Sequence, residues 1–201
     1  MKRLFLGFAV GLLLGSLSQG QELENERNLA QPFAAGGNIR LVLSSGDYTV
    51  RAGNSDDIRV RWSAENLDHV SDMKRIKVDL RISDSTATIR TSGPTKHARI
   101  VVEVPPQSHL ALNMRAGDVR IVGVEGNKDI HMTAGDLKID VLPSSYALMH
   151  ATVKVGDLEA EPLGISKSGF GRSLNWNGVG KYTLHATLFA GDLTLSRPAV
   201  H

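Results

Sequence analysis

Residues 112–121 of the chain read LNMRAGDVRI, and the dipeptide Gly-Asp near their centre occurs four more times in similar surroundings. Apolar and polar side chains alternate before each Gly, and the alternation resumes one residue out of phase after it. Alternation with a period of two is typical of a β-strand with one buried face. The phase slip predicts a corner or bulge between two strands that face a common interior. The corner residues are Gly46, Asp47, Gly117, Asp118, Gly135, Asp136, Gly156, Asp157, Gly191 and Asp192.

Both residue types suit such a corner. Glycine adopts positive φ without a Cβ clash, and the short Asp carboxylate accepts hydrogen bonds from nearby backbone N–H groups. A single strand-corner-strand unit cannot bury its apolar face alone, so the repeat predicts short coils that stack on one another. The expected fold is therefore all-β, a β-solenoid-like stack of short coils with an antiparallel strand region on its N-terminal side.

The chain begins with features typical of a secretory signal. Lys2 and Arg3 precede an apolar stretch over residues 4–17, and Ser18-Gln19-Gly20 offers small residues for cleavage. The apolar stretch is short for a bilayer span, which leaves an uncleaved anchor as the alternative. We expect a signal peptide over 1–20, a flexible polar segment over 21–35 and one β-solenoid-type domain over 36–201. That domain divides into a strand and hairpin lead-in over 36–106 and the Gly-Asp coils over 107–201.

Charge and cysteine content limit the function classes. Without the two basic residues of the signal segment, the 23 basic residues fall to 21 and equal the 21 acidic ones. No basic stripe of the kind that nucleic acids require is present, so we expect no nucleic-acid partner. The chain has no cysteine, so its stability must come from stacked strands and apolar burial. We expect no membrane span after signal cleavage and a location in the periplasm, in the medium or on the cell surface.

The Asp residues of the corners are the first candidate site. Coils in register would place Asp118, Asp136 and Asp157 along one edge, about 5 Å apart. A divalent cation would relieve their repulsion, but the Gly-Gly-x-Gly-x-Asp repeat of calcium-binding solenoids is missing. We favour an Asp that caps its own corner in water, and we expect no metal and no cofactor.

Other polar side chains form no recognisable catalytic motif. The seven histidines lack His-x-His or His-Glu-x-x-His spacing, which favours surface positions over a zinc site. Arg120, Lys138 and Glu159 each follow a corner Gly by three residues and form either a solvated mixed-charge ladder or part of a catalytic face. We assign no catalytic residue. The Gly-rich segment 164–180 interrupts the repeat, and its Phe170 and Trp176 are candidate ligand-contact aromatics, unless they pack over a coil edge.

The segment from Ile100 to Leu195 resembles a bacterial family of secreted β-strand-repeat domains of unknown function, known as "putative adhesins". The similarity lies in a strand that ends in Val-Pro at residues 102–105, the segment 112–121 that follows it, and Ala-Gly-Asp-Leu at 134–137 and 190–193. The resemblance implies a right-handed parallel β-helix or similar solenoid outside the cytoplasm. It implies no catalytic residue.

The preferred function is a non-enzymatic extracytoplasmic β-solenoid module that acts as an adhesin, surface or scaffolding protein in the cell envelope. One alternative is a polysaccharide lyase or hydrolase on the same fold. Another is a periplasmic module that binds a partner in envelope signalling. The expected partner is an envelope protein or a glycan, and open ends of the stack would allow self-association.

Overall fold

The computed structural model describes residues 26–65 and 70–199, so the predicted signal peptide lies outside the described residues. The strands in chain order are β1 (Glu26–Pro32), β2 (Asn38–Leu43), β3 (Gly46–Ala52), β4 (Asp57–Ala64), β5 (Lys77–Ser83), β6 (Thr86–Ser92), β7 (Ala98–Val104), β8 (His109–Val122), β9 (Lys128–Ala134), β10 (Leu137–Asp140), β11 (Tyr146–Ala160), β12 (Ile165–Asn177), β13 (Tyr182–Ala190) and β14 (Leu193–Ser196). The helical elements are short: α1 (Val70–Met73), η2 (Pro143–Ser145) and η3 (Glu161–Leu163). No helix among the described residues is long and apolar enough to cross a membrane.

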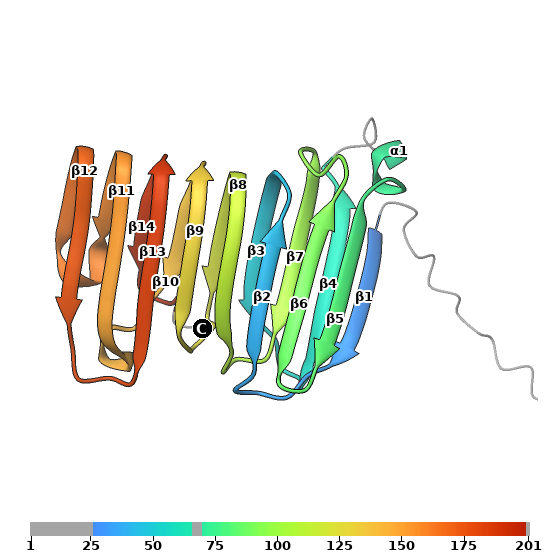
Figure 1. The fold of residues 1–201 in the computed structure, drawn as a ribbon, viewed down its shortest axis with the longest axis horizontal. Coiled ribbons are helices and arrows are strands. Elements are labelled where there is room, and N and C mark those ends of the chain that lie inside the picture. The colour runs from blue at the N-terminus through green and yellow to red at the C-terminus, as the bar shows by residue number, and fades with distance from the viewer. Residues whose placement is uncertain (1–25, 66–69, 200–201) are drawn as a thin grey trace, which may run out of the picture.

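The strands form two layers that run along the molecule (Figure 1). Hydrogen bonds connect β5, β6, β2, β8, β9, β13, β11 and β12 in that order in one layer, which we call the β2 layer. The other, the β3 layer, contains β1, β4, β7, β3, β8, β10, β14, β11 and β12. The long strands β8, β11 and β12 bend and belong to both layers. Each Gly-Asp repeat therefore lies where the chain passes from one layer to the other.

The predicted β-helix is wrong. Parallel pairings connect β8, β10, β14, β11, β13, β9 and again β8, so six strands close into a parallel β-barrel with further strands attached. In a β-helix each coil stacks on the next one along the chain. Here the β13/β14 unit lies between the β9/β10 unit and β11, although it follows β11 in sequence. The repeat predicted the local units, but long-range pairing determines their order.

The N-terminal part also differs from expectation. Antiparallel pairing is limited to β1–β4–β7 and β5–β6, while β2 and β3 run parallel to both of their neighbours. Residues 26–32, which were expected to be flexible, form the edge strand β1. They order because they pair with β4 along their whole length and are followed by the buried Phe33.

The predicted common interior is confirmed. Leu137, Ile139, Leu158 and Leu193 follow their corner glycines and are each at most 1% exposed. Residues from both layers join in one cluster of buried apolar side chains that runs from Phe33 to Leu195. The phase slip therefore lets both arms of each unit contribute to the same core.

The corner glycines stack backbone against backbone. Each of the five has positive φ, from 110° at Gly135 to 152° at Gly46. A Cβ atom on Gly135 would overlap the carbonyl oxygen of Gly117, and a Cβ on Gly191 would overlap that of Gly135. The same relation connects Gly117 to Gly46 and Gly156 to Gly191. No other residue permits both this conformation and this close approach.

We predict that Gly135→Ala destabilises the protein by more than about 3 kcal/mol, since it adds backbone strain and a collision with main-chain atoms. The matched control is Gly53→Ala, because a Cβ there makes only ordinary contacts, the nearest at 3.6 Å. Urea unfolding followed by circular dichroism measures both variants. Equal stability of the two would show that the glycine contacts do not constrain the fold.

A buried lysine lies inside the barrel, at the first residue of β9. Lys128 is 1% exposed, and its Nζ donates to the carbonyl oxygens of Val124 (2.7 Å) and Gly126 (3.3 Å) and to the Tyr146 hydroxyl (2.6 Å). Three acceptors match the three protons of an ammonium group. Burial nevertheless lowers the pKa of Lys128 to about 8, although the nearby Glu125 opposes the shift, and burial raises the pKa of Tyr146.

This burial makes stability depend on pH. Below about pH 8 both states are protonated, and the folded protein bears the full cost of the buried charge. Between about pH 8 and 10 the unfolded chain binds more protons, so we expect the free energy of unfolding to rise by about 2 kcal/mol. Chemical unfolding across this range should show the rise in wild type and in the control Lys138→Met, at an exposed position of β10, but not in Lys128→Met. A flat profile in wild type would contradict the buried charge.

Candidate binding surface

The outer face of the β2 layer collects most of the described histidines. His109, His131, His150 and His185 point outward from β8, β9, β11 and β13, whose alternate residues are buried. His97 alone among the five described histidines lies elsewhere, beside Glu65 on the β7 side of the molecule. We call the outward side of β2, β8, β9, β13 and β11 the histidine face.

Strand register arranges this face in rows across the strands. One row contains Arg40, Ala111, Asp129, His185, His150 and Asn175. The next row contains Val42, Asn113, His131, Thr187, Thr152 and Ser173. The centre of the face is therefore built from amide, hydroxyl and imidazole groups, with Asp129 as its acid.

Specific contacts orient several of these groups. His131 Nε2 lies 3.1 Å from Asp129 Oδ1, and His150 Nδ1 lies 2.5 Å from Asn175 Oδ1. The rings of His150 and His185 are neighbours, with centroids 6.1 Å apart. Polar groups that are held in place but remain exposed can hydrogen-bond a ligand at little entropic cost.

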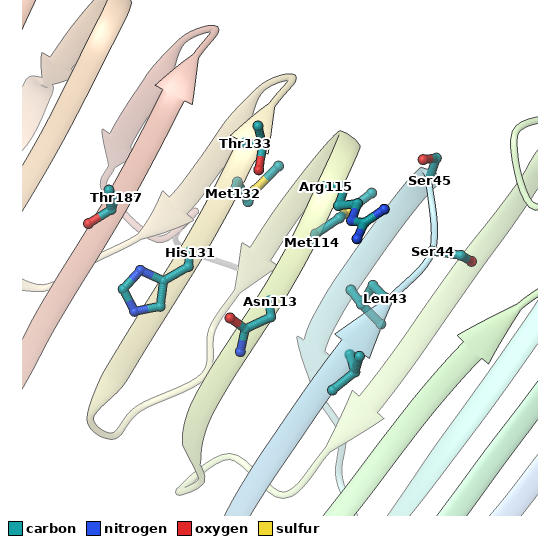
Figure 2. A pocket seen from close by; sticks show the side chains of 11 residues that line it. Leu43, Ser44, Ser45, Asn113, Met114, Arg115, His131, Met132, Thr133 and Thr187 are labelled. Atoms are coloured by element: carbon teal, nitrogen blue, oxygen red, sulfur yellow. The ribbon is translucent and has the colours of Figure 1, made fainter.

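Two shallow pockets hollow the same face. One, of about 560 Å³, lies over the later residues of these strands, where Asn113, His131 and Thr187 come from three neighbouring strands (Figure 2). The other, of about 510 Å³, lies over their earlier residues and is bordered by Arg40 and His185. Each pocket spans several neighbouring strands and is lined by apolar as well as polar side chains.

The outer face of the β3 layer has a different chemistry. Asp47, Asp118, Asp136, Asp192 and Asp157 follow one another across neighbouring strands in a line that we call the Asp row. The N–H of Asp136 donates to Asp118 Oδ1 (2.9 Å), that of Asp192 to Asp136 Oδ1 (3.2 Å) and that of Asp157 to Asp192 Oδ1 (3.0 Å). The carboxylates of Asp118, Asp136 and Asp192 thus each cap the next unit rather than their own corner. Burial and the charge of Asp118 raise the pKa of the Asp47 carboxyl.

The structure assembles no catalytic or metal constellation from the predicted residues. Arg120 lies beside Lys138, but Thr194 separates Lys138 from Glu159, so the expected ladder is interrupted. Within the residues that the structure describes, no group of three or more His, Cys, Asp or Glu side chains is arranged to hold a metal ion.

Phe170 and Trp176 lie on β12, the strand that occupies most of the Gly-rich segment 164–180. β12 pairs with β11 along both layers and closes the C-terminal end of the stack. Trp176 packs against the core, whereas Phe170 is 77% exposed where β12 bends. The two aromatic side chains therefore point into different surroundings, and ligand contact by either remains a prediction.

The sequence places the four histidines at outward positions but does not group them. Their grouping depends on which strands are neighbours, and β13 lies between β9 and β11 against chain order. The available signal was period-two alternation with polar residues that are mostly Asn, Thr and His. The sequence did not indicate that Lys128 is buried, because a lysine at the start of a strand ordinarily lies in solvent.

Comparison with known proteins supports the fold. The crystal structure of a "putative cell adhesion protein" from Clostridium sporogenes matches 86% of this chain and 99% of its own, at 11% identity and a TM-score of 0.52. A "putative adhesin" from Bacteroides fragilis matches 85% of this chain and 96% of its own, at 10% identity and a TM-score of 0.34, too low to carry an argument. No protein-family model matches the sequence, and no curated protein does. The first likeness shows a shared fold, and membership of the strand-repeat family stays a prediction.

Proposed function

We propose that the chain is a non-enzymatic binding module that acts outside the cytoplasm in the manner of an adhesin, and that the histidine face holds its ligand. One observation carries the proposal. Outward side chains of five neighbouring strands bring amide, hydroxyl and imidazole groups together over two pockets whose lining also includes apolar side chains. Such a surface suits an extended, hydroxyl-rich ligand that is held by many weak hydrogen bonds.

Two further points support this proposal over the enzyme alternative. The histidine face offers one acid at its centre, Asp129, whereas glycoside hydrolysis ordinarily requires a pair of carboxyl groups across the scissile bond. The name of the Clostridium sporogenes structure also favours adhesion. A glycan of the cell envelope is the ligand that best fits this chemistry.

A glycan array probed with the purified protein tests the proposal. We expect binding that the double variant Asn113→Ala/Thr187→Ala weakens about thirtyfold, since two hydrogen bonds of about 1 kcal/mol each are lost. The matched control is Arg120→Ala, at an exposed position on the opposite layer, and it should bind like wild type.

Two results would overturn this proposal. Binding that survives the double variant but is lost in Arg120→Ala would move the ligand to the β3 layer. Shortened glycans detected by mass spectrometry after incubation would favour the lyase or hydrolase alternative.

A further inference from the structure

We propose that the histidine face binds an anionic polysaccharide as the pH falls below neutral, with His131, His150 and His185 supplying the positive charge. The inference deepens the proposed function and rests on it. Imidazole is the side chain that changes charge between pH 5 and 8, so mild acidification is enough to alter this surface.

The three imidazoles come from adjacent strands and lie close together. His150 and His185 are direct neighbours across the β11–β13 pair, and His131 lies on β9, on the other side of β13. His109 differs, because its Nδ1 accepts a hydrogen bond from the N–H of Asn127 (3.0 Å) and protonation there would break that bond. The proposal therefore rests on the other three.

The charges around them determine the effect of protonation. Asp129 on β9 faces His131 and is the neighbour of His185 across the β9–β13 pair. The basic groups lie at the margins: Arg90 on β6, Arg40 on β2, Arg115 on β8 and Lys154 on β11. β12 contributes the neutral Asn175, and Glu125 and Lys181 border the pocket beside His109. Above neutral pH the centre thus carries one negative charge, and acidification adds up to three positive charges to it.

The same surface favours a polysaccharide over a lipid bilayer. The exposed large apolar side chains of the described chain are Leu142, Val155, Phe170, Val179 and Phe189. Of these, Phe189 lies at the margin of the histidine face, two residues before Gly191, and the apolar side chains that line the pockets are mostly buried beside exposed Asn, Thr and His. A bilayer surface would gain little from such groups. The hydroxyls of a sugar, in contrast, can hydrogen-bond to the Asn and Thr side chains, and its acidic groups can pair with the imidazoles.

The Asp row disfavours binding of a polyanion along its own line. It lies on the outer face of the β3 layer, the opposite side of the molecule, and there it repels a polyanion. Electrostatic attraction and repulsion on opposite faces orient a charged ligand before contact. The β3 layer also carries Arg120 and Lys138 at exposed positions, so the repulsion is confined to the line of Asp carboxylates.

The test uses dextran sulfate as the probe and unmodified dextran as its neutral counterpart. At constant ionic strength we expect dextran sulfate to bind at least about tenfold more tightly at pH 5.5 than at pH 7.5. In His150→Gln/His185→Gln the ratio should fall to about twofold or less. The matched control His97→Gln, on a histidine away from the face, should keep the wild-type ratio.

A second measurement tests the proposal even if the double variant folds poorly, because it uses the wild-type protein. Bound anion stabilises imidazolium, so a sulfated oligosaccharide should raise the titration midpoints of these histidines in NMR spectra of the wild-type protein.

Midpoints unchanged by the oligosaccharide, a wild-type pH ratio near one, or a ratio preserved in the double variant would overturn the proposal. Equal binding of dextran and dextran sulfate at both pH values would also overturn it but leave the proposed glycan module intact. Tighter binding to phosphatidylglycerol vesicles than to dextran sulfate would assign the face to a membrane instead.

Discussion

The backbone contact between successive corner glycines is the constraint on which the fold depends. Where Gly135 lies against the carbonyl of Gly117, the two main chains approach more closely than any Cβ would allow. This approach keeps adjacent strand pairs in register at the point where they change layer. Five such glycines in line hold the two layers at a common bend, and the interior between them fills with Val, Ile, Leu and Ala side chains.

The bend also determines which side chains face outward. Because the alternation slips by one residue at each Gly-Asp, the Asp that follows the glycine stays outside while Leu137 and its equivalents turn inward. The Asp row therefore follows from the same geometry as the core. Its carboxylates are brought close, yet those of Asp118, Asp136 and Asp192 each accept a backbone N–H of the next unit, which offsets part of the repulsion.

How far the sequence predicts this molecule depends on the range of the interaction concerned. Period-two alternation and the glycine phase slip are local, and they predicted strands, corners and the burial of Leu158 and Leu193. The order of the units is not local, because β13 fits between β9 and β11 only when all three have formed. The histidine face could not be predicted for the same reason. His131, His150 and His185 are far apart in sequence, and the non-sequential pairing of their strands makes them neighbours.

The ends of the stack show how a repeating fold stops. At the C-terminal end β12 reverses direction, and two of its inward positions carry Lys167 and Arg172 in place of apolar residues. Lys167 reaches across the bend to donate to the carbonyl of Ser173 (2.7 Å), so a charged group satisfies the backbone where a further strand would otherwise pair. Polar residues at such an end discourage addition of another copy, in the way that charged side chains protect exposed sheet edges. The two broad outer faces, rather than the ends, are then the surfaces left for a ligand, and the histidine face combines pockets with imidazole groups, whose charge varies near neutral pH.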